Sequence, residues 1–288
     1  MDWLIPTLLC ALSLALADAG TKVWLGELSD GERVFVRLGL PGFLLMPLAF
    51  VTLPDNPDWS RFMPWVLVSL PIEVFAMHLY VRALHAGPLS LTLPYTAFTP
   101  VFVALTGWLL LGEQVSSGAL GGIVLVVVGS WLLNTGQGRH PLMVLRAIIE
   151  QRGARLMLAT AVLYSITSVT TRGAVRETDG LFFGAFYLGL IALTIVAWHG
   201  ARGEAVWTIT WRGPRRLWLV SAAMGLMVIL HFVALRLVDV ATMIAVKRTS
   251  LLWGVLIGVV FLGEETGARR VVAGVIMVAG AAIVVLNG

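Results

Sequence analysis

The sequence predicts an all-α integral membrane protein whose ten transmembrane helices form two inverted five-helix repeats. Three observations lead to this fold class: a very apolar composition, ten segments of suitable length, and a similarity between the two halves of the chain. Of the 288 residues, 58% are hydrophobic and 12% are charged, and the mean hydropathy is +0.90. A soluble domain carries about 25% charged residues, so this composition excludes a water-soluble globular protein.

Each predicted span is a largely apolar run, because a helix needs about 20 such residues to cross roughly 30 Å of hydrocarbon. Turn residues such as Pro54 and the pair Gly213-Pro214 separate the runs. The ten segments are residues 3–25, 33–53, 64–84, 89–111, 118–135, 154–175, 181–199, 215–236, 240–262 and 270–287. The first contains Ala15-Leu16-Ala17, which resembles a signal-peptide cleavage site, but no Lys or Arg precedes it. We therefore expect a retained helix there rather than a cleaved signal.

The basic residues predict the orientation of these spans. With ten spans, twelve arginines fall on one side of the membrane and three on the other. The larger group is Arg33, Arg82, Arg139, Arg146, Arg152, Arg155, Arg202, Arg212, Arg215, Arg216, Arg269 and Arg270; the smaller is Arg61, Arg176 and Arg236. Because basic loops stay in the cytoplasm, we expect a multi-pass inner (plasma) membrane protein with both termini outside. Orientation thus explains the pI of about 9.7, and we expect no nucleic-acid partner.

Motifs for enzymatic chemistry are missing from the sequence. The single cysteine, Cys10, excludes a disulfide framework and a zinc site built from cysteines. No phosphate-binding loop, Gly-x-Ser-x-Gly or His-Glu-x-x-His motif is present, and no two histidines have metal-ligand spacing. We expect neither an enzyme nor a bound cofactor or metal.

An internal repeat appears when the chain is shifted on itself by 150–151 residues. Leu111-Gly112-Glu113 then falls on Leu262-Gly263-Glu264, and Gly129 falls on Gly280. Five spans are an odd number, so the second half enters the membrane from the opposite side and the repeat is inverted. The predicted organisation is a first repeat at 1–135, a cytoplasmic loop at 136–153 and a second repeat at 154–288.

These repeated features resemble the EamA-like branch of the drug/metabolite transporter superfamily. The matching stretches are Ala104–Leu133 and Val255–Val284, and Lys22 and Arg37 also lie where that family tends to carry a Lys and an Arg. The resemblance implies a secondary transporter with a central cavity and with peripheral fifth and tenth helices. Relatives are often drawn with both termini in the cytoplasm, whereas the arginine distribution of this chain predicts the reverse.

Charged residues inside the spans are candidate functional residues, since a charge at the bilayer centre costs at least about 2.5–3.5 kcal/mol. Five cations and two carboxylates remain after the loops are assigned, a net charge of +3. They are Asp18, Lys22, Arg37, Glu73, Arg172, Lys247 and Arg248. This excess of positive charge favours a substrate with an anionic group.

The first two spans supply an acid and two bases. Asp18 and Lys22 are four residues apart on one helical face, so we expect them to pair, either as a structural ion pair or as a group that couples protons or balances charge. Arg37 lies one turn after Arg33 and either faces the interior or extends to a lipid headgroup.

Glu73 and Arg172 lie deep in their segments. Glu73 follows Pro71, with Tyr80 continuing its face, and is predicted to carry protons, to balance a substrate-binding cation, or to be a buried acid that serves packing only. Arg172 shares a face with Ser168 in a hydroxyl-rich run that either lines a wet path or joins helices. We expect all four side chains to contribute to substrate binding.

The adjacent pair Lys247-Arg248 is the strongest local signal. Arg binds two oxygens of a phosphate or carboxylate while Lys acts as a point charge. The pair is similar to the Lys-Arg of the sugar-phosphate translocator branch of the superfamily, although its distance from the following Gly-Glu differs by about one turn. The structural alternative is a pair neutralised by Glu73 and Asp18. Tyr95, between two prolines, is a predicted wall residue of the cavity.

Together, these features predict a secondary active transporter for a small polar, anion-bearing metabolite, working by alternating access. The alternative is a proton-coupled exporter of amino acids or drug-like cations, in which Glu73 and Asp18 bind the cation. An integral-membrane enzyme or structural subunit is the third possibility. Expected partners are the substrate, the lipid bilayer and protons as coupling ion, with the chain acting as monomer or homodimer.

Overall fold

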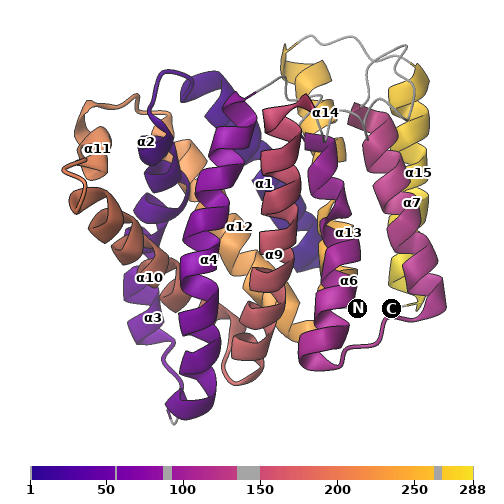
Figure 1. Cartoon of the computed structure of the whole chain (residues 1–288), viewed down its shortest axis with the longest axis horizontal. Coiled ribbons are helices and arrows are strands. Elements are labelled where there is room, and N and C mark those ends of the chain that lie inside the picture. The colour runs from indigo at the N-terminus through magenta and orange to yellow at the C-terminus, as the bar shows by residue number, and fades with distance from the viewer. Residues whose placement is uncertain (1, 56, 87–92, 135–149, 263–267, 288) are drawn as a thin grey trace. The chain divides into compact units, whose positions relative to one another are not determined.

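A computed structural model describes residues 2–55, 57–86, 93–134, 150–262 and 268–287 (Figure 1). Within these ranges the chain is helical and contains no strand, which confirms the all-α class. The helices form two compact units, Met1–Val74 with Thr170–Val238, and Phe75–Val169 with Asp239–Gly288. Each unit therefore combines a segment from each half of the sequence.

In the first unit, α1 packs along α12, and α10 packs against both α3 and α12 (Figure 1). Aromatic rings join these helices, with the centroids of Phe183 on α10 and Phe232 on α12 lying 4.7 Å apart. The helices are α1 (Leu4–Trp24), α2 (Asp30–Val34), the π-helical segment η1 (Phe35–Gly39), α3 (Leu40–Val51), the first part of α4 (Trp59–His85), the last part of α9 (Arg152–Arg176), α10 (Gly180–Gly200), η3 (Val206–Thr208), α11 (Ile209–Arg212) and α12 (Leu217–Leu237).

In the second unit, α7 packs along α15, and α13 contacts α6, α7 and α15. Figure 1 shows α7 and α15 running side by side. Besides the remaining parts of α4 and α9, this unit contains the 3₁₀ segment η2 (Leu93–Phe98), α6 (Thr99–Leu111), α7 (Ser117–Asn134), α13 (Val240–Lys247), α14 (Ser250–Leu262) and α15 (Ala268–Asn287).

Acidic and hydroxyl side chains define where several helices begin. Asp179 accepts hydrogen bonds from the first backbone N–H groups of α10, and Ser29 and Glu32 form a reciprocal capping box at α2. Ahead of α4, Asp58 accepts from the backbone of Ser60 and Arg61. The hydrogen bond from the Ser60 hydroxyl lowers the pKa of Asp58 below its usual value.

Glycines allow α7 and α15 to approach closely. A Cβ atom at Gly122 would lie 2.7 Å from the carbonyl oxygen of Gly280, and one at Gly280 would lie 2.8 Å from the carbonyl oxygen of Gly122. A Cβ atom at Gly129 would lie 2.8 Å from the backbone nitrogen of Met277. Small residues let helix backbones pack closely in membranes, where lipid tails provide no hydrophobic driving force between helices. Two glycines of the predicted internal repeat, Gly129 and Gly280, thus lie at one helix–helix contact.

Among the described residues, six helical stretches are long and apolar enough to cross a membrane: Leu4–Trp24, Asp30–Val51, Trp59–Ala83, Arg152–Arg176, Gly180–Gly200 and Leu217–Leu237. Shorter apolar helices cover Tyr95–Leu111, Ser117–Leu132 and Val271–Asn287. Large apolar side chains face outward on these helices, among them Phe50, Val51 and Leu286, which are 74%, 82% and 76% exposed. Such surfaces suit contact with lipid tails rather than water.

Three predicted segments differ in detail from the observed helices. The predicted span 240–262 is divided into α13 and α14, and the predicted span 33–53 contains the π-helical segment η1. Of the predicted span 89–111, residues 89–92 lie outside the described residues, and the rest consists of η2 and α6. The predicted loop at 136–153 lies mainly outside the described residues, and α9 begins at Arg152.

Replacing Gly122 by Ala should destabilise the α7–α15 contact. The added Cβ would meet backbone atoms of Gly280 and Val284 at 2.7 and 2.8 Å, and backbone atoms cannot move aside as a flexible side chain can. Overpacking of this kind costs about 1–3 kcal/mol. We expect Gly122→Ala to lower the midpoint of thermal unfolding of the detergent-purified protein.

Gly121→Ala is the matched control, since no atom lies within 4 Å of its added Cβ. Both substitutions replace Gly by Ala in the same helix and gain the same intrinsic helix propensity. Equal unfolding midpoints for the two variants would show that close packing at Gly122 contributes nothing to stability.

Candidate functional site

The side chain of Arg37 is buried in the first unit, with 1% exposure, and its guanidinium makes an ion pair. Nη2 donates to Oδ1 of Asp18 at 2.7 Å, and Nη1 donates to Oγ1 of Thr21 at 2.9 Å. Asp18 and Thr21 lie on one face of α1, three residues apart. The second predicted span therefore places its cation against the acid of the first span. The interpretation that Arg37 extends to a lipid headgroup is wrong, because the side chain points into the protein.

Arg37 is held by a π-helical turn. The backbone N–H of Leu40 bonds to the carbonyl of Phe35, five residues earlier, and so closes the wide turn that contains Arg37. Single π-turns inside α-helices occur frequently at functional sites. Lys22, which the sequence pairs with Asp18, is exposed in the last turn of α1, where a cation interacts favourably with the helix dipole.

Arg172 binds the end of a neighbouring helix. Its Nη1 donates to the carbonyl oxygen of Leu235 in the last turn of α12, and the residue is 9% exposed. The last carbonyls of a helix have no partner within the helix, so a cation there satisfies a backbone acceptor. This contact gives Arg172 a structural role at the end of α12, and its role in substrate binding stays a prediction.

Glu113 of the repeated Leu-Gly-Glu motif binds the start of α13. Its Oε2 accepts a hydrogen bond from the backbone N–H of Val240 at 3.2 Å, and Asp239 caps the same helix by accepting from Thr242. Gly112, with φ of +65°, ends α6 and turns the chain toward Glu113. The sequence repeat identified Glu113 but could not show that it bonds to a helix 127 residues away. The equivalent Glu264 lies outside the described residues.

Lys247 and Arg248 lie at the break between α13 and α14. The N–H of Thr249 bonds to the carbonyl of Val246, and the N–H of Leu251 bonds to that of Arg248, so the tighter i to i−3 pattern replaces the α-helical one. Both basic side chains are half-buried. Two cations thus stand next to the N-terminus of α14, whose backbone dipole carries partial positive charge. This part of the chain is suited to binding an anion.

Glu73 lies in the first unit, where the buried phenol of Tyr187 from α10 interacts electrostatically with its carboxylate. Ser69, one turn earlier on α4, is fully buried. The structure thus adds Tyr187 to the surroundings of Glu73. The sequence reasoning missed this residue because a tyrosine in an aromatic run looks like packing.

Several predicted wall residues lie in the second unit. Tyr80 is 8% exposed, and its ring lies 6.3 Å from that of Tyr164 on α9. The Tyr164 hydroxyl donates to Sδ of Met77 at 3.9 Å. Tyr95 is fully buried in η2, and Ser168 is 8% exposed.

The hydroxyl-rich run of α9 bonds in part to its own helix. The Ser165 hydroxyl donates to the carbonyl of Val162 at 2.7 Å, and the Thr167 hydroxyl donates to that of Tyr164 at 3.5 Å. These contacts favour a structural role for the two hydroxyls within α9 over the lining of a water-filled path.

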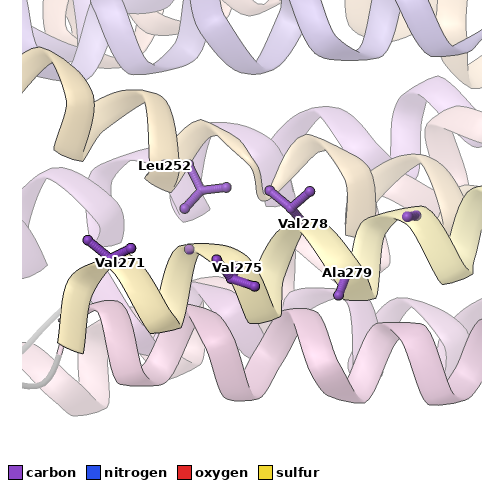
Figure 2. A pocket seen from close by; sticks show the side chains of 7 residues that line it. Leu252, Val271, Val275, Val278 and Ala279 are labelled. Atoms are coloured by element: carbon purple, nitrogen blue, oxygen red, sulfur yellow. The ribbon is translucent and has the colours of Figure 1, made fainter. Parts of the chain in front are cut away.

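A groove in the second unit lies along α15 beside Leu252 of α14 (Figure 2). Its lining residues are Leu252, Val271, Gly274, Val275, Val278, Ala279 and Ala282. Figure 2 shows Val278 and Leu252 on facing helices, and no polar side chain takes part. The groove suits lipid tails rather than a polar substrate. Among the described residues, no group of three or more His, Cys, Asp or Glu is arranged to hold a metal ion.

The apolar helices of spanning length indicate a multi-pass membrane protein. The model of the EamA-like transporter family matches residues 1–135 and 151–286. The chain therefore belongs to the EamA-like transporter family, whose members are membrane transporters of the drug/metabolite type rather than enzymes.

The other comparisons concern the fold. No curated protein matches the sequence. One solved structure, described as the crystal structure of a protein, is similar over 99% of this chain and 96% of its own, with a TM-score of 0.72 and 18% sequence identity. At this identity the likeness establishes the fold alone.

The ion pair between Arg37 and Asp18 predicts unequal effects of neighbouring substitutions. Asp18→Ala leaves a buried guanidinium without its carboxylate, and breaking a buried pair costs up to about 3–5 kcal/mol. We expect a clear loss of thermal stability, less than that limit because the Asp18 side chain is 34% exposed. Lys22→Ala, on the exposed part of α1, should change stability little.

A double-substitution cycle separates the pair from ordinary packing. Asp18→Ala/Arg37→Met removes both charges, so it should be less destabilised than the sum of the two single variants. Additive losses, or a loss in Lys22→Ala as large as that in Asp18→Ala, would contradict the assigned pairing.

Proposed function

We propose that this chain is a secondary active transporter that moves a small polar metabolite with an anionic group across the inner membrane by alternating access. Its membership of a transporter family supports transport. The anionic character of the substrate rests on one observation, the helix break at Lys247 and Arg248. The proposal includes ten spans in two inverted five-helix repeats, with both termini outside the cytoplasm.

Three groups at the helix break support anion binding: two basic side chains and the N-terminus of a helix. Arg248 offers a planar fork that fits two oxygens of a phosphate or carboxylate, and Lys247 adds a point charge. The N-terminus of α14 follows directly at Ser250 and adds backbone dipole. Interrupted helices are a recurrent device for substrate binding in secondary transporters.

Asp18 and Glu73 are assigned to charge balance and to the coupling of transport to protons. Asp18 bonds to Arg37 and so balances a cation within the first unit. Glu73, beside Tyr187, is the candidate proton carrier, while Tyr80, Tyr95 and Ser168 are proposed walls of the substrate path. The engagement of Asp18 by Arg37 weighs against the alternative in which Asp18 and Glu73 together bind a cationic substrate.

Ligand-induced stabilisation tests this proposal. The detergent-purified protein is heated with phosphate and carboxylate metabolites, zwitterionic amino acids or organic cations, each at two pH values. A ligand that binds the folded state raises stability with the logarithm of its concentration over Kd. We expect anions to raise the unfolding midpoint, and Lys247→Ala and Arg248→Ala each to remove that rise.

Arg61→Ala is the control, because Arg61 is 72% exposed and pairs with Asp58 outside the predicted site. It should retain the full response to anions. If both variants at the helix break respond to anions like the control, the anion site is wrong. If only amino acids or cations stabilise the protein, only at the higher pH, and Glu73→Gln abolishes this effect, the proton-coupled exporter is the better account.

A further inference from the structure

The segment Ala201–Arg216 links α10 to α12 and is strongly basic. It contains four arginines and one acid, Glu204, which gives a net charge of +3. Since α10 and α12 are both long enough to span the bilayer, their connection lies at the membrane–water interface. The segment also carries two tryptophans, Trp207 and Trp211.

The packing of this segment directs its two tryptophans outward. Val206 and Ile209 are buried, with 4% and 3% exposure, whereas Trp207 and Trp211 are 39% and 87% exposed. Arg212 donates to Oε1 of Glu32 at 2.7 Å and so ties the segment to α2. The fold therefore buries the small apolar residues and leaves the largest amphipathic ones on the surface, which is the usual placement of Trp at membrane interfaces.

Two arginines of the segment lie over tryptophan rings of the neighbouring helices α10 and α1. The guanidinium carbon of Arg202 lies 4.3 Å from the ring centroid of Trp198, and that of Arg216 lies 5.6 Å from the ring of Trp24. Arg202, Arg215 and Arg216 are all exposed. The one acid of the segment, Glu204, bonds to His199 at 2.5 Å, and the four arginines of the segment exceed its charge by three.

We propose that this surface, formed by Arg202, Trp207, Trp211, Arg215 and Arg216, binds the headgroup of an acidic phospholipid. A phosphodiester accepts paired N–H donors from Arg, and Trp rings pack at the depth of the lipid glycerol and carbonyl groups. A soluble anion would use the arginines but would leave both tryptophans exposed to water. Basic residues close to the membrane contribute about 1 kcal/mol each to the binding of anionic lipid.

Lipid binding to the detergent-purified protein tests the proposal. The unfolding midpoint is followed while dioleoylphosphatidylglycerol or dioleoylphosphatidylcholine is added, so that the chains are the same and only the headgroup differs. We expect stabilisation by the phosphatidylglycerol alone. Arg215→Gln/Arg216→Gln should raise the lipid concentration for half-maximal stabilisation about 30-fold, as two lost arginine contacts imply.

Two further variants and one soluble ligand make the result decisive. Trp211→Ser should weaken the response to phosphatidylglycerol, while Arg61→Gln, at an exposed arginine paired with Asp58, should retain it. Equal stabilisation by phosphatidylcholine would overturn the proposal, and so would an unchanged response in the double arginine variant. Stabilisation by glycerol 1-phosphate as strong as by the lipid would identify a site for soluble phosphate instead. None of these outcomes depends on transport.

Discussion

The compensation of charge inside apolar helices is the constraint on which this structure depends. Arg37 stands within an apolar span and is 1% exposed, so neither water nor lipid headgroups stabilise it. The carboxylate of Asp18 and the hydroxyl of Thr21 replace that solvation. The pair links the π-helical turn of the second span to α1 and thereby joins the two spans.

The same rule operates at helix ends. Within the first unit, the cation of Arg172 satisfies a carbonyl in the last turn of α12. Within the second unit, the acids Asp239 and Glu113 satisfy N–H groups in the first turn of α13. The chain passes from one unit to the other between Val238 and Asp239. On each side of this connection, a backbone group at a helix end bonds to a side chain of its own unit. The cation lies at the C-terminal end of α12 and the acids lie at the N-terminal end of α13, which is the placement that the helix dipole favours.

Sequence reasoning predicted the six described helices of spanning length, because an apolar run of about 20 residues has few alternatives to a spanning helix. It did not predict the break after Lys247, where neither Gly nor Pro interrupts the run. It also did not predict the long-range contacts of Arg37 and Glu113, whose partners lie 19 and 127 residues away. Spacing along one helix identified Lys22 as a partner of Asp18, whereas packing between helices brings in Arg37.

The central claim is that an anion reaches the helix break at Lys247 and Arg248, and thiol accessibility tests it most directly. Cys10 is buried, and its removal gives a background without cysteine. Lys247→Cys is compared with Val278→Cys, which lies in the apolar groove of α15. Only a hydrated thiol ionises and reacts readily with a charged sulfonate reagent. The account predicts rapid labelling of Lys247→Cys and little labelling of Val278→Cys. Equally slow labelling of both would contradict it.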